Sequence, residues 1–396
     1  MLADLDMVWV GTRPKPTFAK CRPICPDQRH APTIAQQQGE DEQEDPARPT
    51  ASPIIRRMQT SGRHPRPSSE RASALQPRQA GAGHELDGNW RLYAILVTYR
   101  RPSELGVMLD GLLNQTRRPD RLIVIDNSPS GETQAIAERS RDKGLAIDYL
   151  PAPDNLGPAG GIARGMQHLM ALANGNDWVV LLDDDDPPRS DWLLAELATF
   201  ATSMLRQDPH TAAVGSRGAR FDRRRGRVVR VKDAELGGPI LVDHIAGNKL
   251  PLYNVQAIRD MGGFRSELFF GFEELDYGLR LSDAGYSLYA HGAVWRDANV
   301  NRRSRIASLP KALIAEPGWR RYYSLRNLID ILRRTGHSWA AVRVTLTRGF
   351  FKPLANLPIR PKTAIRHLRL NVRATRDAWQ GTLGKTVDPE DPPFPV

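Results

Sequence analysis

Residues 183–186 are four consecutive aspartates, and they directly follow the apolar run at residues 178–182. Carboxylates that end a buried strand are costly unless a cation neutralises their charge. Carboxylate oxygens are hard ligands that suit Mg²⁺ or Mn²⁺, and an ion held there can bind the phosphates of a nucleotide. The alternative is an acidic loop that caps a helix beginning near Ser190.

The pattern around the aspartates predicts the elements that position them. Apolar runs alternate with stretches of helical spacing, in the order strand 92–97, helix after Pro102, strand 122–125, helix 132–141, strand 145–150, helix 162–173, strand 178–182 and helix 191–205. This alternation predicts an α/β fold with a mostly parallel sheet covered by helices on both faces. Ligands of such sheets bind at the carboxyl ends of the strands. Thr98, Asp126, Asn155 and the aspartates all lie at those ends.

A glycine-rich loop at residues 155–161 precedes the third expected helix. It lacks the lysine of a P-loop, and it does not follow the first strand as a dinucleotide-binding loop does. One interpretation is a tight turn between a strand and a helix. The other is that small residues let a substrate approach the backbone and the helix N-terminus closely.

The composition is that of a soluble globular protein, with 396 residues of which 40% are hydrophobic and 26% charged. No stretch approaches the roughly 20 apolar residues that a membrane-spanning helix needs. The N-terminus lacks the basic start and the apolar core of a signal peptide, so we predict a cytoplasmic protein. Residues 11–89 contain eleven prolines and one aromatic residue, Phe18. We therefore expect residues 1–89 to be a disordered extension.

The net charge of +11 is concentrated near the C-terminus. Between Arg302 and Arg376, eighteen lysines and arginines accompany two acidic residues, Glu316 and Asp330. Such a block favours an anionic partner, namely lipid headgroups, a lipid-linked phosphate or a nucleic acid. Apolar and basic residues interleave over residues 343–360, as they do in helices that lie on a membrane surface. Helices that pack on the main domain with solvated arginines are the alternative.

Further motifs follow one another along the chain. They are Val-Thr-Tyr-Arg-Arg-Pro at 97–102, Leu-Asn-Gln-Thr at 113–116, Ile-Val-Ile-Asp-Asn-Ser at 123–128, Asp-Asn-Leu-Gly-Pro-Ala-Gly-Gly at 154–161, Met-Gly-Gly-Phe at 261–264, Phe-Phe-Gly-Phe-Glu-Glu-Leu-Asp-Tyr-Gly-Leu-Arg at 269–280 and Tyr-Tyr-Ser-Leu-Arg-Asn at 322–327. With the aspartates, this series resembles the family 2 glycosyltransferases, inverting enzymes of the GT-A fold. The glycine-rich loop and the last motif look most like those of actinobacterial galactofuranosyl- and rhamnosyltransferases.

The resemblance covers about residues 92–334 and implies a domain organisation. A GT-A domain would occupy residues 90–300, after the disordered extension at 1–89. A basic helical region would follow at residues 301–396, and membrane association is one of its two interpretations. The fold implied by the resemblance is a Rossmann-like, mostly parallel sheet with helices on both faces.

The resemblance also implies a metal site. Asp183 and Asp185 match the Asp-x-Asp motif with which the family binds Mn²⁺ or Mg²⁺, and Asp184 would face the nucleotide-sugar. A divalent ion that bridges the donor diphosphate stabilises negative charge on the departing nucleotide.

The remaining donor contacts follow from the same positional match. Thr98 and Arg101 would line the nucleotide pocket, and Asp126 would contact the base or the ribose. Asn155, in the glycine-rich loop, would also contact the nucleotide-sugar donor.

One position departs from the family pattern. Members commonly close the metal site with a histidine directly after a Val-Trp pair, but Val294-Trp295 is followed here by Arg296. His291 lies five residues earlier. Either two carboxylates and waters complete the coordination, or Arg296 pairs with the diphosphate as a fixed cation. A weakened dependence on metal is the third interpretation of Arg296.

An acidic pair marks the expected general base. Glu273 and Glu274 fall where the family has two acidic residues, the second of which is the base. A carboxylate near the acceptor hydroxyl removes its proton as the oxygen attacks the anomeric carbon. We expect Glu274 to be this base, with Asp276 as the alternative and with Glu273 supporting the acceptor or the metal. All three could instead be the polar positions of an amphipathic helix.

The function implied by the resemblance is that of a hexosyltransferase in cell-wall biosynthesis. It would move galactofuranose or rhamnose from a UDP- or dTDP-linked donor to a lipid-linked or polysaccharide acceptor. The basic region suits peripheral attachment to the inner face of the plasma membrane. The alternatives are a sugar-phosphate nucleotidyltransferase and a non-catalytic basic protein that binds nucleic acid or membrane. The last leaves the aspartates unexplained, so we do not expect a nucleic-acid partner.

Overall fold

The computed structural model describes residues 90–306 and 318–390, and for residues 301–306 the backbone alone. The described residues belong to one compact unit. The segment predicted to be disordered, residues 1–89, lies outside them.

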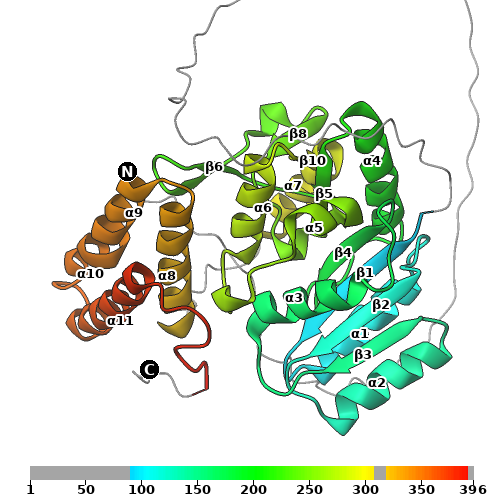
Figure 1. Ribbon diagram of the computed structural model, residues 1–396, viewed down its shortest axis with the longest axis horizontal. Coiled ribbons are helices and arrows are strands. Elements are labelled where there is room, and N and C mark those ends of the chain that lie inside the picture. Colours follow the sequence, from blue (N-terminus) through cyan, green and yellow to red (C-terminus); the bar gives the residue numbers. More distant parts are fainter. Residues whose placement is uncertain (1–89, 307–317, 391–396) are drawn as a thin grey trace, which may run out of the picture. The chain divides into compact units, whose positions relative to one another are not determined.

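The elements alternate through most of the chain (Figure 1). The strands are β1 (Leu92–Thr98), β2 (Arg121–Asp126), β3 (Ile147–Pro151), β4 (Trp178–Asp183), β5 (Thr211–Gly215), β6 (Arg220–Asp222), β7 (Arg227–Val229), β8 (Pro239–Val242), β9 (Leu252–Asn254) and β10 (Ser287–His291). The helices are α1 (Pro102–Leu113), α2 (Gly131–Asp142), α3 (Gly157–Leu169), α4 (Leu193–Gln207), α5 (Val255–Met261), α6 (Glu273–Asp283), α7 (Gly292–Ile306), α8 (Gly318–Arg334), α9 (Ser338–Val344), α10 (Lys352–Ala355) and α11 (Pro361–Gln380). Short 3₁₀ turns η1 (Asp233–Glu235), η2 (Gly247–Lys249) and η3 (Ser266–Leu268) and the π-helical η4 (Thr345–Phe351) complete the set.

The main sheet has eight strands in the order β3-β2-β1-β4-β9-β5-β10-β8. β1 pairs in parallel with β2 and β4, β2 with β3, and β5 with β10. β9 runs antiparallel to β4 and β5, and β8 runs antiparallel to β10. The predicted mostly parallel α/β sheet is therefore confirmed. The apolar pattern did not reveal β5 and β10 or the short antiparallel strands β8 and β9.

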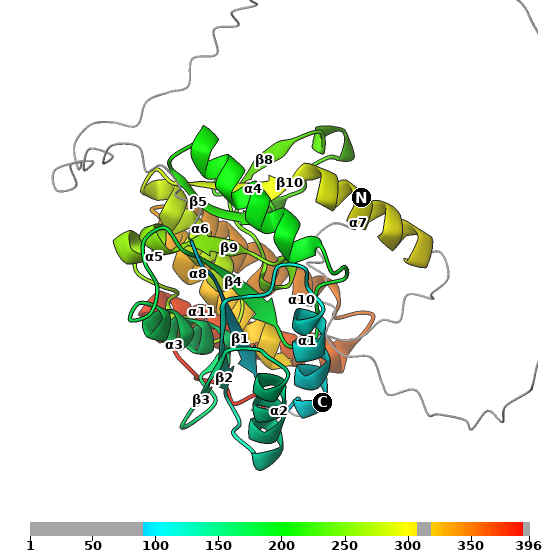
Figure 2. The same ribbon diagram turned by 90° about the vertical axis from the view of Figure 1, so that its right-hand side faces the viewer.

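Strand β1 illustrates why both faces of the sheet are buried. Tyr93 and Ile95 belong to a core shared with α3, α5 and α6, whereas Leu92 and Leu96 belong to a second core with α1, α2 and α4. Successive side chains of a strand point to opposite faces, so a strand covered on both sides needs a continuous apolar run. Figure 2 shows α3 on one side of β1 and α1 on the other.

The glycine-rich loop forms the first turn of α3, which begins at residue 157 and thus earlier than expected. Gly157 has a φ of +67°, and a Cβ there would collide with the Phe269 carbonyl. Asn155 Oδ1 accepts a hydrogen bond from the Gly157 N–H at 2.9 Å. A Cβ on Gly161 would lie 2.6 Å from Val97 Cγ1. The glycines therefore permit close contacts within the protein, which favours the tight-turn interpretation of this loop.

The C-terminal helices pack on α6. Leu275 and Leu279 of α6 share a third core with Tyr323 and Leu328 of α8 and with Ala374 of α11. Figure 1 shows α8, α9 and α11 grouped beside α6. In residues 90–306 and 318–390, no helix is long and apolar enough to cross a membrane.

Candidate active site

The aspartates lie at the carboxyl end of β4, next to the end of β1. Asp183 is the last residue of β4, which pairs in parallel with β1. Thr98 Oγ1 donates a hydrogen bond to Asp184 Oδ2 at 3.0 Å. Arg101 Nη1 lies 2.9 Å from Asp184 Oδ1 and 2.7 Å from Asp185 Oδ2. The structure thus brings Thr98 and Arg101 to the aspartates, and the guanidinium offsets part of their charge.

The carboxylates of Asp183 and Glu274 both lie against Gly247. Glu274 Oε1 accepts a hydrogen bond from the Gly247 N–H at 2.9 Å. A Cβ on Gly247 would lie 3.2 Å from Glu274 Oε1 and 3.3 Å from Asp183 Oδ1. Burial, followed by the nearby charge of Glu274, raises the pKa of Asp183 to about 8. A divalent cation would offset this concentration of negative charge, so the residues fit a metal site.

Few protein side chains are placed to hold such an ion. Within the described ranges, no group of three or more His, Cys, Asp or Glu side chains is arranged to hold a metal ion. Mg²⁺ is commonly bound through one or two carboxylates together with waters and substrate phosphates. Asp183 and Asp185 therefore suit an ion that takes its remaining ligands from waters and substrate oxygens. A site built from protein ligands alone fits them less well.

The segment between β8 and β9 adds two residues that the motifs did not reveal. Gly247 and Lys249 form part of η2. Burial lowers the pKa of Lys249 to about 8, while the charges of Asp186 and Asp183 oppose that shift. No sequence pattern marks this segment, because its position depends on β9 inserting between β4 and β5.

The acidic pair opens helix α6. Glu273 is 5% exposed, and its Oε2 has no hydrogen-bond partner in the described structure. Burial, followed by the charge of Glu274, raises the pKa of Glu273 well above its usual value. Glu274 is more accessible than Glu273. The preceding residue, Phe272, has a φ of +67°, a strained conformation of a kind that clusters at functional sites.

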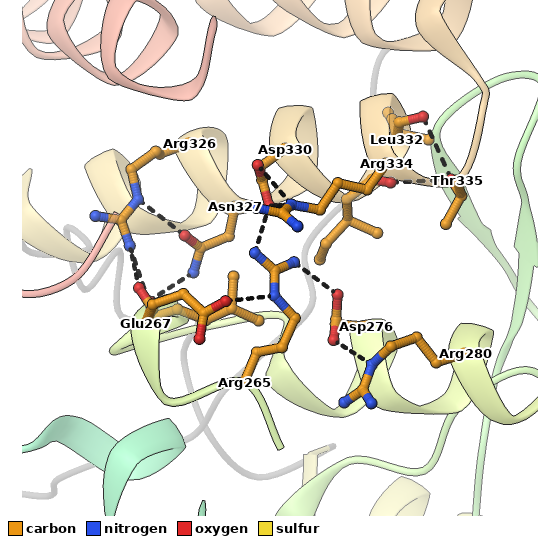
Figure 3. A network of polar contacts seen from close by, with 12 residues as sticks. Arg265, Glu267, Asp276, Arg280, Arg326, Asn327, Asp330, Leu332, Arg334 and Thr335 are labelled. Atoms are coloured by element: carbon orange, nitrogen blue, oxygen red, sulfur yellow. Dashed lines mark hydrogen bonds and ion pairs between the residues drawn. The ribbon is translucent and has the colours of Figure 1, made fainter. Parts of the chain in front are cut away.

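Asp276 is held in a network of ion pairs (Figure 3). Its Oδ1 accepts a hydrogen bond from Arg265 Nη1 at 3.0 Å, and its Oδ2 accepts one from Arg280 Nε at 2.9 Å. Arg265 Nη2 also donates to Asp330 Oδ2 at 2.9 Å. Both oxygens of Asp276 are therefore engaged, and Arg265 links Asp276 of α6 to Asp330 of α8. The arrangement favours Glu274 over Asp276 as the general base.

Arg296 lies on α7, away from the position that the resemblance suggested. Its exposed guanidinium hydrogen-bonds the Leu236 carbonyl, on the segment before β8. No hydrogen bond or ion pair joins Arg296 to residues 183–186 in the part of the chain that is described. His291, at the end of β10, lies 2.9 Å from Glu196 Oε1. The structure thus does not bring Arg296 or His291 together with the aspartates.

Asp126 ends β2 and is fully buried. Its Oδ2 accepts a hydrogen bond from the Tyr149 hydroxyl at 2.7 Å, and its Oδ1 accepts one from the Ser128 N–H at 2.9 Å. Asp126 therefore supports the backbone beside it, and Ser128 lines a cavity.

That cavity, of about 350 Å³, opens at the carboxyl ends of β1, β2 and β3. Its walls include Tyr99, Asn127 and Asn155. The C-terminal segment contributes three further lining residues, Lys385, Asp388 and Glu390. In a sheet of this kind, the cavity occupies the region where ligands bind.

Comparison with known proteins gives a family match for the part of the chain that carries the aspartates. Residues 93–254 match the family described as Glycosyl transferase family 2. Galactofuranosyltransferase GlfT1 of Mycobacterium tuberculosis (strain ATCC 25618 / H37Rv) is 36% identical over 201 residues, which cover 49% of this chain and 65% of that protein. GlfT1 of Mycolicibacterium smegmatis is 40% identical over 108 residues, which cover 27% and 34%. The matches span less than two thirds of these curated relatives. The resemblance drawn from the motifs is confirmed.

Solved structures with a similar course of the chain include two glycosyltransferases. Mannosyltransferase PcManGT from Pyrobaculum calidifontis, in complex with GDP-Man and Mn²⁺, is 16% identical, covers 74% of this chain and 87% of its own, and has a TM-score of 0.44. GalNAc-T7 with UDP, GalNAc and Mn²⁺ is 12% identical, covers 62% and 48%, and has a TM-score of 0.45. At these TM-scores, the fold assignment rests on the observed sheet and on the family match.

Proposed function

Since residues 93–254 are a glycosyltransferase family 2 domain, we propose that this chain is a nucleotide-sugar-dependent hexosyltransferase that works by inverting displacement. The observation that carries the proposal is that the carboxylates of Glu274 and Asp183 lie against the same residue, Gly247, at the carboxyl end of β4. One carboxylate is placed for proton transfer and the other for a metal ion. The family match does not favour the nucleotidyltransferase or the non-catalytic alternative.

Glu274 acts as the general base in this proposal. An acceptor hydroxyl oxygen attacks the anomeric carbon while its proton passes to the Glu274 carboxylate. The bond between the anomeric carbon and the diphosphate oxygen breaks, and the nucleoside diphosphate leaves with the bonding electrons. The Gly247 N–H holds Oε1 of Glu274, so that Oε2 can take the proton. A single displacement of this kind inverts the anomeric configuration.

The diphosphate side of the site is built around the aspartates. Asp183 and Asp185 would hold Mn²⁺ or Mg²⁺, which supplies Lewis-acid stabilisation of the departing diphosphate when bound. Arg101 orients Asp184 and Asp185 through its two short contacts. Lys249 adds a partly buried cation near Asp183. In this arrangement waters and donor oxygens, not Arg296, complete the coordination.

We assign a UDP-linked galactofuranose as the donor and a lipid-linked or polysaccharide glycan of the cell envelope as the acceptor. The support is the identity of 36% and 40% to proteins named galactofuranosyltransferase. A dTDP-linked rhamnose is the competing donor. Thermal-shift measurements with each nucleotide-sugar distinguish them, because a ligand that binds the native state raises the melting temperature.

Activity measurements with Glu274→Gln test the mechanism. Purified protein with Mn²⁺ should release UDP from UDP-galactofuranose in the presence of acceptor. Loss of a general base typically costs about 10²- to 10⁴-fold in rate. Glu138→Gln, on the exposed face of α2, should keep the wild-type rate. If Glu274→Gln keeps that rate while a folded Asp276→Asn variant is inactive, the base is assigned to the wrong residue.

The exposed surface of the C-terminal region, residues 338–380, supports peripheral attachment to the inner face of the plasma membrane. Trp339 is 85% exposed, Ile359 76% and Phe351 62%, and the neighbouring Lys352 and Arg360 are exposed as well. Such apolar side chains can enter the headgroup layer while basic ones contact anionic lipid. Sedimentation with phosphatidylglycerol vesicles should capture the protein and should fail for a Trp339→Ser, Phe351→Ser double variant. Equal capture of both proteins would argue against attachment through this face.

A further inference from the structure

Residues 384–390 return from the end of α11 to the cavity at the carboxyl ends of β1, β2 and β3. Lys385, Asp388 and Glu390 are part of its lining. The remaining walls come from the loops that follow the three strands. One side of the cavity is therefore supplied by a segment that is distant in sequence from the family 2 domain.

Ion pairs join this segment to the opposite walls. Glu390 lies 2.8 Å from Arg100 Nη1 and accepts a hydrogen bond from the Tyr99 hydroxyl. Lys385 Nζ lies 3.6 Å from Asp154 Oδ1, and the Lys385 side chain is 27% exposed. Arg100 has a φ of +53°, an uncommon conformation for a residue with a side chain. The contacts thus reach the two residues that directly follow Thr98.

The anchor of the segment is the Tyr-Tyr-Ser-Leu-Arg-Asn motif of α8, to which the proposed reaction assigns no role. Tyr323 Oη donates a hydrogen bond to the Val387 carbonyl at 2.6 Å and accepts one from the Val387 N–H at 3.0 Å. Arg326 Nη1 donates to the Gly384 carbonyl at 2.7 Å and to Thr386 Oγ1 at 3.0 Å. Val387 is 1% exposed and Arg326 is fully buried. These contacts hold residues 384–387 in one position.

The same motif also holds the loop that precedes the general base. Arg326 Nη2 donates a hydrogen bond to the Leu268 carbonyl at 2.9 Å. Asn327 Nδ2 donates to the carbonyls of Phe270 and Gly271 at 2.9 and 2.8 Å. Figure 3 shows Arg326 and Asn327 side by side above this loop. The motif therefore joins the loop before Glu273 to the segment that lines the cavity.

We propose that residues 384–390 complete the nucleoside part of the donor site, with Lys385 and Asp388 as specificity residues and Tyr323 and Arg326 as positioning residues. The proposal rests on the proposed function. A pyrimidine presents carbonyl oxygens and an imide N–H, and a ribose presents hydroxyl groups. The Lys385 ammonium can donate to a carbonyl, and the Asp388 carboxylate can accept from an N–H or a hydroxyl. The two groups form an ion pair at 3.5 Å, and because an ammonium has three donors and a carboxylate has two acceptor oxygens, each can also bind a ligand.

Titration calorimetry of the full chain with UDP and with dTDP, each with Mn²⁺, tests the specificity residues. The wild-type protein should bind at least one of the two. Lys385→Ala should weaken that binding about tenfold, the usual effect of losing a hydrogen bond to a charged group. Lys362→Ala, exposed at the start of α11, should bind as the wild type does.

Tyr323→Phe tests the anchor, because it removes the hydroxyl that fixes Val387 and leaves the ring. It should weaken nucleotide binding severalfold, and nucleotide should slow amide exchange over residues 384–390 in the wild type. If Lys385→Ala and Tyr323→Phe both bind normally and nucleotide leaves that exchange unchanged, the segment is outside the donor site and the proposed function stands. If the wild type binds neither nucleotide, the proposed function falls and this inference falls with it.

Discussion

Asp183 and Glu274 approach the same side of the Gly247 backbone, one from the end of β4 and the other from the first turn of α6. Burial disfavours the charged form of Asp183, and the nearby charge of Glu274 disfavours it further, so both raise the pKa of Asp183. A divalent cation bound by these carboxylates would offset the repulsion between their negative charges. The site therefore lies where β4, η2 and α6 meet.

Adding a Cβ at Gly247, against the carboxylates of Asp183 and Glu274, should impair the site. In Gly247→Ala the new Cβ would lie within 3.3 Å of both carboxylates, so Asp183 or Glu274 must shift. Because a displacement of about 1 Å at a reacting group can cost about a hundredfold, and the shift required here is a few tenths of an ångström, we expect kcat/KM to fall severalfold. Gly237→Ala is the matched control, since no atom lies within 4 Å of its Cβ. Equal activity of the two variants would show that the reaction does not depend on the exact positions of the Asp183 and Glu274 carboxylates.

Asp276→Asn should act mainly on stability. It removes a buried charge paired with Arg265 and Arg280, and breaking such a network typically costs about 3 kcal/mol. Urea denaturation should show this loss in the free energy of unfolding. Asp110→Asn, which removes an exposed pair with Lys143, should cost less than about 1 kcal/mol. A stable but inactive Asp276→Asn protein would instead assign Asp276 to the chemistry.

His244 should make the protein less stable in mild acid. It is 5% exposed, and burial lowers its pKa from the ordinary value near 6.5 to about 4. The unfolded chain therefore binds the proton first as pH falls, and stability is lost progressively between about pH 6.5 and pH 4. From pH 7.5 to pH 5 this amounts to about 2 kcal/mol. Urea midpoints of His244→Gln should depend less on pH than those of the wild type, and identical pH dependence would contradict this account.

Two glycines within helices should respond in opposite directions to alanine. A Cβ on Gly165 in α3 would lie 2.6 Å from Ile95 Cγ2 in the core, and overpacking of this kind costs about 1–3 kcal/mol. Gly106 in α1 has no atom within 4 Å of its Cβ, so Gly106→Ala should stabilise the helix by about 0.5–1 kcal/mol. Melting temperatures should fall for the first variant and rise for the second. A rise for both would show that α3 can move away from β1.

Local patterns in the sequence were sufficient to predict the first four strands of the sheet and the helices between them. Runs such as residues 92–97 are apolar throughout because both faces of those strands are buried. The patterns did not reveal β8 and β9, since strands of three or four residues are too short for a periodicity to stand out. Gly247 and Lys249, on the segment between those strands, therefore lay outside the predicted site.

The sequence by itself determined the α/β class, the family and the line of polar residues at the strand ends, because each of these is a local pattern of residue types. Only the tertiary structure decided which partners each carboxylate of α6 meets, and the proposal of Glu274 as the base depends on those partners. Glu274 and Asp276 are two residues apart on the same helix, yet Asp276 meets Arg265 and Arg280 while Glu274 meets Gly247. Likewise, only folding brings residues 384–390 to the cavity. Such pairings depend on the packing of distant segments, which no local spacing encodes.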